Sequence, residues 1–364
     1  MKKYCILFLS ALLALSSCQQ PRFEIKRGAN ISHWLSQSSL TSEKRITYFT
    51  ESDMAKLSQD GFDHIRLPID EVIMWDKDHN KIEANWKHLG NAMDWCQKYG
   101  LKCILDLHIL RSHYFIVAPG EKNALFSDPA AQDWLVEMWR QLSAFLKDYP
   151  TDMLAYEFMN EPVADDPDDW NDLIDKVHKA LRELEPKRFL VVGSNQQQSI
   201  FTFDDLRIPK NDKRIILSFH YYHPMLLTHH KASWTDFRRY TGTCHYPGVM
   251  VTPQEYALLD EDNQKLVNDF TKEWDRDMMA DLIRPVVEKA KELGLQCYCG
   301  EWGTINLAPR PDAERWFKDM ISIFDELDVA WTVWDIKAEF GYWNPDGTID
   351  ESYRQILMSG KGLK

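Results

Sequence analysis

Apolar residues recur along the chain in eight short runs that alternate with longer amphipathic segments. The runs are almost continuously apolar, which is typical of strands buried on both faces of a parallel sheet. The expected strands span residues 25–32, 64–69, 102–108, 154–162, 188–194, 214–222, 296–303 and 330–337. The amphipathic segments between them lie near residues 51–59, 86–99, 130–148, 169–184, 280–293 and 313–326. Strand–helix alternation through eight strands predicts an α/β protein with a single-domain (β/α)8 barrel, the TIM barrel.

Two connections depart from this alternation. The connection after the fifth strand contains little helical pattern, and the one after the sixth strand runs from about residue 223 to residue 279. Connections of that length in a compact domain are usually functional. We therefore expect the 223–279 segment to lie on the rim of the barrel where the chemistry takes place.

The first residues have the pattern of a targeting segment. Lys2 and Lys3 precede an apolar stretch at 6–15, which is too short to span a bilayer and suits the core of a secretory signal. Leu15-Ser16-Ser17-Cys18 then resembles a bacterial lipobox, in which the cysteine becomes the lipidated first residue. An ordinary signal peptide with a chance cysteine is the alternative.

This pattern predicts a lipoprotein signal peptide at residues 1–17 and a folded domain at residues 18–364. Lipidation at Cys18 would anchor the protein in the bacterial cell envelope, at the outer membrane, on its periplasmic or outer face. The membrane would then be contacted only through the lipid.

Charge and composition narrow the class of partner. The chain has 56 acidic and 43 basic residues and a formal net charge of -13, which argues against nucleic acid and against an anionic membrane surface. A neutral polysaccharide suits this charge. The 14 Trp, 14 Tyr and 17 Phe fit either sugar-stacking surfaces or a large core. Cys297 and Cys299 share one face of an expected strand but stand too far apart for a disulfide, so we expect small buried side chains.

Polar and aromatic residues stand where the expected strands end. In a (β/α)8 barrel those ends meet at one face, which carries the active site. Seven strands supplying such residues to the same rim is hard to explain by packing alone. Glu161 and Glu301 are among them, and two carboxylates across a cleft are the minimal set for cleaving a glycosidic bond. The residues at these positions are Asn30, His33, Trp34, Arg66, His108, Asn160, Glu161, His220, Tyr222, Glu301 and Trp334.

Seven short motifs, in order and at barrel spacing, make the chain resemble glycoside hydrolase family 5. The family belongs to a clan whose barrels carry catalytic glutamates on strands four and seven, and the resemblance covers essentially all of residues 18–364. It implies a retaining mechanism and a cellulase-like enzyme. The motifs are Gly28-x-Asn30, Ile65-Arg66-Leu67-Pro68, Asp106-Leu107-His108, Asn160-Glu161-Pro162, Phe219-His220-Tyr221-Tyr222, Gly300-Glu301-Trp302-Gly303 and Trp331-x-x-Trp334.

The resemblance also implies roles for individual residues. Glu161 would be the general acid/base and Glu301 the nucleophile, with carboxyl groups about 5–5.5 Å apart. Burial and the second carboxylate should raise the pKa of Glu161. Arg66 and Tyr222 would hold Glu301 ionised and oriented.

Further supporting and substrate-binding residues follow from the same resemblance. His220 would orient Glu161, Asn160 would contact the sugar 2-OH, and His108 would bind neighbouring hydroxyls. Trp334 would lie under the sugar at the point of cleavage.

The expectations for the remaining candidates rest on their positions alone. His33 and Trp34 are expected at the rim in contact with sugar, and Trp234 on the long connection as a platform for the leaving-group side. Glu157 faces inward four residues before Glu161, and we expect it to be a structural carboxylate paired deeper in the barrel.

No metal and no cofactor are expected. The insertion holds four histidines, but neither His-x-x-x-His nor a carboxylate spacing supports a zinc site. The acidic run at residues 165–169 fits a solvated helix start better than a Ca²⁺ site.

We therefore expect a retaining β-glycoside hydrolase, an endo-β-1,4-glucanase that acts by double displacement on a β-linked polysaccharide or oligosaccharide, as a monomer. An exo-acting β-glucosidase and a β-mannanase on the same scaffold are alternatives, because fold alone does not select the substrate. The alternative from another class is a catalytically inactive carbohydrate-binding lipoprotein.

Overall fold

The computed structural model describes residues 20–117, 120–344 and 346–363. The expected signal peptide at 1–17 and the lipidation site Cys18 lie outside these residues. Among the described helices, none is both long and apolar enough to cross a bilayer.

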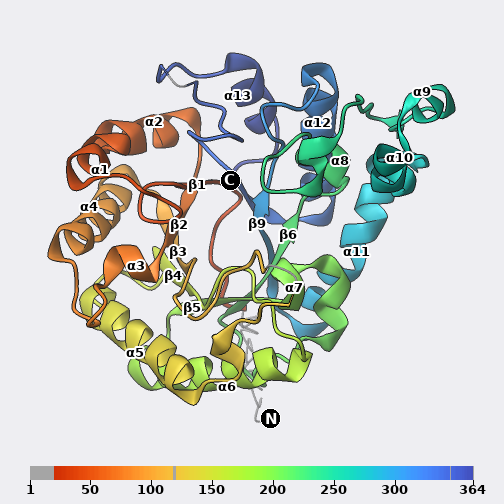
Figure 1. Cartoon of the computed structure of the whole chain (residues 1–364). Coiled ribbons are helices and arrows are strands. Elements are labelled where there is room, and N and C mark those ends of the chain that lie inside the picture. The colour runs from red at the N-terminus through yellow and green to blue at the C-terminus, as the bar shows by residue number, and fades with distance from the viewer. Residues whose placement is uncertain (1–19, 118–119, 345, 364) are drawn as a thin grey trace, which may run out of the picture.

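Eight parallel strands close into a barrel, and this confirms the predicted fold (Figure 1). Around the barrel the order is β1-β10-β9-β6-β5-β4-β3-β2, so strands adjacent in the chain are neighbours in space. All eight predicted strands are present, although several are shorter than predicted. The strands are β1 (Arg27–Asn30), β2 (His64–Ile69), β3 (Lys102–Leu107), β4 (Leu154–Glu157), β5 (Phe189–Gly193), β6 (Ile215–Tyr221), β9 (Gln296–Trp302) and β10 (Ala330–Val333).

Helices form a ring outside the strands, and the six predicted amphipathic segments are all helical (Figure 1). They correspond to α2 (Glu51–Asp60), α4 (Glu83–Tyr99), α5 (Pro129–Leu146), α6 (Pro167–Leu184), α11 (Arg276–Leu293) and α12 (Arg310–Leu327). Short additional helices are α1 (Ser42–Tyr48), α3 (Glu71–Met74) and α13 (Glu351–Leu357), with the 3-10 turns η1 (Ala124–Phe126) and η2 (Ile200–Asp205).

Local sequence signals explain where α2 begins and ends. Thr50 accepts a hydrogen bond from the backbone N–H of Asp53, and the Asp53 carboxylate accepts one from the backbone N–H of Thr50, which is a capping box. Gly61 ends the helix with φ 97°, a left-handed conformation that glycine adopts without a steric penalty.

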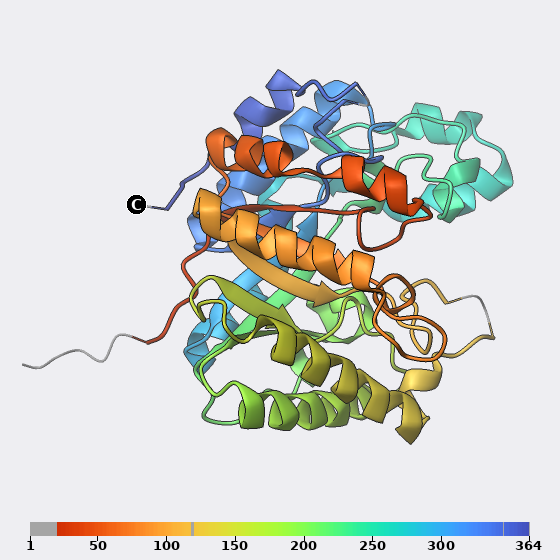
Figure 2. The ribbon, with the colours of Figure 1, turned by 90° about the vertical axis from the view of Figure 1, so that its left-hand side faces the viewer.

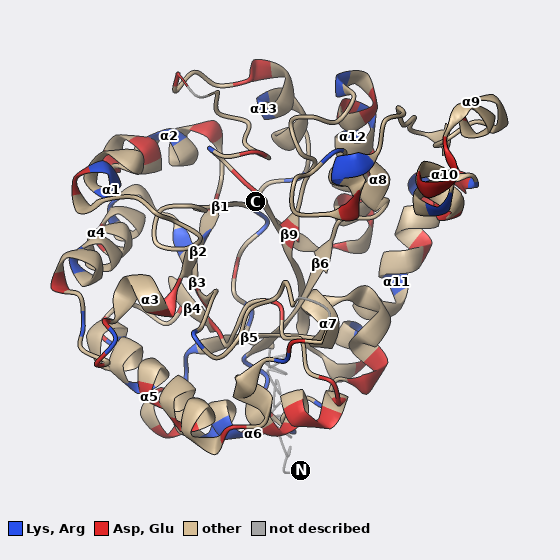
Figure 3. Cartoon of the chain, viewed as in Figure 1, with Lys and Arg blue, Asp and Glu red and all other residues tan. Residues whose placement is uncertain are grey.

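The core has two parts. The larger part fills the layer between the strands and the helix ring, and a smaller cluster closes the bottom of the barrel. In that smaller cluster, Phe23 and Ile25 from the segment before β1 pack against inward-facing strand residues such as Ile104 and Tyr298. Charged residues gather on the outer helices, with both signs interspersed, while the strands are mostly uncharged (Figure 3). Cys96, Cys103, Cys244, Cys297 and Cys299 are all buried and free, which agrees with the expectation for the last two.

The long connection between β6 and α11 is an insertion with short elements of its own. It contains α8 (Met225–Thr228), η3 (Asp236–Arg239), α9 (Pro253–Leu258), α10 (Glu261–Val267) and η4 (Asn268–Phe270). A two-stranded antiparallel pair, β7 (Gly248–Val249) and β8 (Glu273–Trp274), joins the middle of the insertion to its C-terminal end. In Figure 2 the strand arrowheads point toward the side on which this insertion lies. The insertion therefore stands at the carboxyl ends of the strands, as predicted.

Candidate active site

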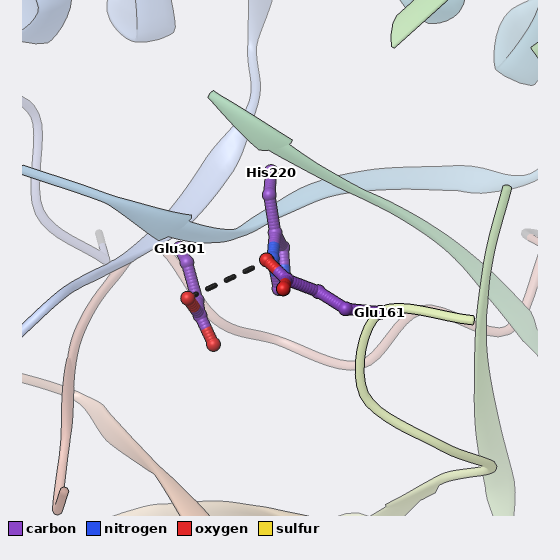
Figure 4. Close-up of side chains that lie close together, drawn as sticks. All are labelled: Glu161, His220 and Glu301. Atoms are coloured by element: carbon purple, nitrogen blue, oxygen red, sulfur yellow. Dashed lines mark hydrogen bonds and ion pairs between the residues drawn. The ribbon is translucent and has the colours of Figure 1, made fainter. Parts of the chain in front are cut away.

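Two glutamates face each other where β4 and β9 end. Glu301 lies within β9, and Glu161 follows β4 in a turn, with a left-handed φ of 45°. One carboxylate oxygen of Glu161, one of Glu301 and a ring nitrogen of His220 all lie within 4.8 Å of one another (Figure 4). This spacing is far shorter than the roughly 6.5–9.5 Å that leaves room for a water molecule in inverting glycosidases. It matches the retaining arrangement.

Arg66 of β2 holds Glu301 from below and is fully buried. Its Nη1 donates to Oε1 of Glu301 at 2.8 Å, and its Nη2 donates to Oδ1 of Asn160 at 2.8 Å. Its Nε and Nη2 donate to the two oxygens of Glu157 at 2.7 and 3.1 Å. One planar guanidinium therefore fixes the nucleophile candidate and the residue before Glu161 in a single rigid arrangement. Glu157 is paired below the cavity, as expected.

The carboxylates around Arg66 outnumber its single charge. Asp106 Oδ2 lies 3.0 Å from Nη2, so Asp106, Glu157 and Glu301 all contact one guanidinium. Burial raises the pKa of Asp106 to about 7 against the opposing effect of Arg66, and burial likewise raises the pKa of Glu157. A region this dry cannot hold every acid ionised, so protons are retained on part of the network near neutral pH.

Glu301 receives more support for its ionised form than Glu161 does. Besides Arg66, the hydroxyl of Tyr222 donates to Oε2 of Glu301 at 3.0 Å. Burial raises the pKa of Glu301, while Arg66, His108 and the Tyr222 hydrogen bond act in the opposite direction. Of the two glutamates, Glu301 is therefore the one that ionises first.

Glu161 retains its proton to higher pH. Burial and then the negative charge of Glu301 raise its pKa well above the usual range. Its Oε1 lies 2.7 Å from Nδ1 of His220, whose own pKa is lowered well below normal, chiefly by burial and then by Arg66. The imidazole is therefore neutral, so it orients the Glu161 carboxyl without supplying a positive charge.

Four side chains that line the cavity have a buried polar atom without a partner among the described residues: Gln37, His108, Asn160 and His220. Asn160 Nδ2 and His108 Nε2 have no hydrogen-bond partner among the described residues. Both residues line the cavity, and Nδ1 of His108 is fixed by Oδ2 of Asp106 at 2.8 Å. Buried polar atoms in native proteins almost always have partners. Substrate hydroxyls are the natural partners here.

Above the two glutamates lies a cavity of about 810 Å³. Trp334 forms part of its wall and stacks in parallel on His108, with ring centroids 5.5 Å apart. His33 lines the opening, as does Trp234 from the insertion, which is 39% exposed and packs against Phe340. His33, Trp234 and Trp334 thus lie where sugar contacts were expected, and the contacts themselves stay predictions.

The prediction that Trp34 contacts sugar is wrong. Trp34 is fully buried, its Nε1 donates to the backbone oxygen of Arg45 at 2.9 Å, and its ring packs on Phe49 and Trp95. His33 has a left-handed φ of 55°, so the chain turns directly after β1. This turn leaves His33 at the cavity and sends Trp34 into the layer between barrel and helices.

Several residues of the site were not predicted from the sequence. Asp106 had a usable signal, since it is an acid inside an apolar strand on the same face as His108. Gln196, Gln197, Phe340 and the buried Asp335 also line the cavity. They come from loops without periodicity, so no pattern marked them.

Glu161, His220 and Glu301 are also the one group of three potential metal ligands among the described residues. Arg66 already places a positive charge 2.8 Å from Glu301 and His220 is committed to Glu161, so this group suits proton transfer better than cation binding. The insertion histidines are engaged separately: Nε2 of His245 contacts Glu255 at 2.7 Å, and Nδ1 of His230 contacts Cys244 at 3.5 Å.

Comparisons with known proteins agree with this site. The model of the cellulase family, glycosyl hydrolase family 5, matches residues 27–340. Endoglucanase C of Acetivibrio thermocellus is 31% identical over 336 residues, covering 88% of this chain and 94% of the relative. Cellodextrinase A of Ruminococcus flavefaciens is 27% identical over 308 residues, covering 84% of each.

A solved structure of Thermotoga maritima Cel5A in complex with cellobiose superposes with a TM-score of 0.73 at 20% identity, covering 92% of this chain and 97% of that one. Another structure of Cel5A, in complex with mannotriose, superposes with a TM-score of 0.74. At this identity the likeness supports the fold. The family match across most of the barrel, together with the paired glutamates, leads to one conclusion: this chain belongs to glycosyl hydrolase family 5 and is a glycoside hydrolase.

Proposed function

We propose that this enzyme is a retaining endo-β-1,4-glucanase with Glu301 as nucleophile and Glu161 as general acid/base. The observation that carries the roles is the unequal support of two glutamates whose oxygens lie within 4.8 Å. Glu301 has Arg66 and Tyr222 to stabilise its negative charge, whereas Glu161 has a neutral imidazole. The endoglucanase relatives support the choice of substrate.

In the first step, the Glu301 carboxylate attacks the anomeric carbon while Glu161 donates its proton to the departing glycosidic oxygen. The bond from that carbon to the leaving sugar breaks, and a covalent glycosyl-enzyme forms. Glu161, now ionised, takes a proton from a water molecule that attacks the same carbon and releases Glu301. Two inversions give net retention, and both glutamates return to their starting charge.

Asn160 contributes at the sugar undergoing attack. Its Oδ1 is fixed by Arg66, so Nδ2 is aimed and free to donate to the 2-OH. Such a hydrogen bond strengthens as positive charge develops at the neighbouring carbon. His108 Nε2 contacts a second hydroxyl in the same way, and Trp334 provides an apolar face for the ring.

Product analysis tests the proposal. The purified domain lacking residues 1–18 would be incubated with β-1,4-glucan, mixed-linkage glucan, mannan, xylan and short oligosaccharides, and products followed over time. We expect mid-length products with retained anomeric configuration from the β-1,4-glucan. Products of inverted configuration would refute the roles, and equal activity on mannan would refute the glucan assignment.

Exo action on short β-glucans is the second candidate. Cellodextrinase A is a relative over most of the chain, and Trp234 and Phe340 of the cavity wall pack on each other at 6.2 Å. If this wall closes one end of the cleft, monosaccharide or a single short product would accumulate from the start. The inactive-binding-protein alternative is not supported, because both glutamates and their supporting residues are assembled.

We also propose that the enzyme acts as a monomer anchored to the outer membrane through a lipid on Cys18. The lipobox pattern supports the anchor, and the presence of the whole site within one chain supports the monomer. Full-length protein with Cys18→Ser should lose both fatty-acid labelling and membrane association. Unchanged membrane association would refute the anchor.

A further inference from the structure

The turn after β5 has an unusual backbone. Gln196, Gln197 and Gln198 have φ values of 54°, 59° and 54°, three consecutive non-glycine residues in the left-handed region. The segment that they form, α7 (Asn195–Gln198), lies beside the ends of β5 and β6 in Figure 1. L-residues rarely adopt this conformation even singly, and it persists only where the surrounding contacts impose it.

The contacts that impose it point both to the barrel interior and to the Glu161 loop. Gln198 is fully buried, and its Nε2 donates to Oε1 of Glu157 at 2.8 Å. The Gln197 backbone N–H donates to the carbonyl of Pro162 at 3.2 Å, directly after Glu161. Gln196 Nε2 donates to the carbonyl of Ala164 at 2.9 Å. Hydrogen bonds thus hold the turn both to Glu157, which precedes Glu161 in the chain, and to the loop that follows Glu161.

Glycine at position 193 makes room for Gln198. A Cβ atom at Gly193 would stand 2.4–2.6 Å from the side-chain atoms of Gln198, closer than carbon atoms can approach. Gly193 has no positive φ to explain it, so the close approach of the glutamine is the reason that the structure offers for this glycine.

Glu157 connects Gln198 to the reacting groups through hydrogen bonds. Its Oε1 accepts from both Gln198 Nε2 and Arg66 Nη2, and its Oε2 accepts from Arg66 Nε at 2.7 Å. The same guanidinium holds Glu301 at 2.8 Å. A neutral donor on Glu157 stabilises its carboxylate without competing for the charge of Arg66.

We propose that Gln198 is a positioning residue for the nucleophile Glu301, acting through Glu157 and Arg66. This inference rests on the proposed function, and it gives the strained glutamine turn a mechanistic purpose. Without the Gln198 amide, Arg66 is the one remaining hydrogen-bond donor to Glu157 among the described residues. The guanidinium is then drawn toward Glu157, and its hydrogen bond to Glu301 weakens. The charged and titratable groups that surround Glu157 are Arg66 from β2, Asp106 and His108 at β3, Glu161 after β4, and Tyr298 and Glu301 from β9.

The test compares Gln198→Met and Gln198→Glu with wild type. Methionine keeps the length and removes the donor. Gln141→Met is the control for loss of a glutamine amide: Gln141 on α5 donates to Glu137 at 3.3 Å, accepts from Nε1 of the buried Trp75 at 2.9 Å and has no contact with the site, so this variant can lower the melting temperature without changing kcat. Melting temperature, kcat and KM would be measured for each variant from pH 4 to pH 9.

For Gln198→Met we expect kcat to fall about tenfold with KM within twofold, as for loss of a hydrogen bond to a charged group. In Gln198→Glu the new carboxylic acid can donate to Glu157 while it is protonated. That variant should approach wild type at acidic pH and lose activity as the pH rises and a second negative charge forms. Loss of stability alone would not change the pH profile.

The proposal is wrong if Gln198→Met behaves like Gln141→Met in kcat, or if the Gln198→Glu profile runs parallel to wild type. If Gln198→Met does not fold, the pH profile of the isosteric Gln198→Glu decides alone. Glu301→Gln distinguishes a failure of the proposed nucleophile from a failure of the positioning role alone. If that variant stays active, the proposed nucleophile fails, whereas an inactive Glu301→Gln beside an unaffected Gln198→Met refutes the positioning role only.

Discussion

The surroundings of Glu301 and of Glu161 differ although their oxygens lie within 4.8 Å of each other. Glu301 is reached by a guanidinium and a phenol hydroxyl, both of which donate to it. Glu161 is reached by a neutral imidazole and by the negative charge of Glu301. Two identical side chains therefore take opposite charge states over the same pH range. The neighbouring groups, rather than the residue type, therefore decide which glutamate is the acid and which is the nucleophile.

The largest effect should come from removing the nucleophile. Glu301→Gln keeps the shape of the side chain and abolishes its ability to form the covalent intermediate, so we expect kcat to fall on the order of 10⁴- to 10⁶-fold. Initial rates on a soluble β-glucan measure this. The melting temperature is the control: we expect it to be unchanged, which would show that the variant is folded and that the loss is catalytic. Residual activity above one percent would contradict the assignment.

Removing the acid/base should have an effect that depends on the leaving group. For Glu161→Ala we expect a loss of roughly 10²- to 10⁴-fold on polysaccharide, but little loss in the first step with an aryl glycoside whose leaving group needs no proton. Azide should then speed release of the intermediate, because it needs no general base. A variant that azide leaves unchanged would break the proposed division of roles.

Removing one hydrogen-bond donor from Glu301 should narrow the difference in pKa between the two glutamates. Tyr222→Phe deletes a hydrogen bond that stabilises the ionised nucleophile, so the pKa of Glu301 rises. Activity requires ionised Glu301 and is lost as the pH falls through that pKa, so the acidic limb of kcat/KM should move to higher pH. We also expect kcat/KM to drop about 10- to 100-fold, as for a hydrogen bond of about 1.5–3 kcal/mol to a charged group. An unmoved acidic limb would contradict this account.

The basic limb reports the other glutamate. Activity requires protonated Glu161 and is lost as the pH rises through its raised pKa. His220→Asn removes the imidazole but keeps a polar group, and we expect the basic limb to move while the acidic limb stays within a few tenths of a pH unit. Movement of both limbs together would mean that the two glutamates titrate as one unit.

The smallest expected effect distinguishes two tryptophans. Trp234→Ala removes an exposed cavity-wall ring and should raise KM for polymer severalfold with little change in melting temperature. Trp34→Ala removes a fully buried ring and should lower stability by about 3–5 kcal/mol, with KM unchanged in the folded fraction. The reverse pattern would restore Trp34 as a substrate contact.

Residues on strands were the predictable part of the site. Arg66, Glu157 and Glu301 stand inside apolar runs, and the period of a strand assigns each to the barrel interior. Closure of eight strands then brings their ends to one face whatever the helices contain. Glu161 and His220 were found in the same way, at or just beyond strand ends.

The side-chain directions of Trp34 and Gln198, both on turns, were not predictable in this way. Trp34 follows β1 by only a few positions, yet a left-handed residue before it reverses its direction. Gln198 appears in the sequence as one of three glutamines after a strand, with nothing to show that its amide reaches the barrel interior. Turns have no period, so the direction of a side chain there depends on backbone angles that tertiary contacts impose.

The barrel, its active rim and the two glutamates could be predicted from the amino-acid sequence, because strand periodicity and strand count depend on local pattern. Only the folded structure shows which contacts give the two glutamates their different charge states, which tryptophan faces the cavity and what Gln198 touches. Those properties depend on distances of a few ångströms between residues far apart in the chain. Electrostatic and hydrogen-bonding energies change steeply over such distances, so only the folded arrangement fixes them.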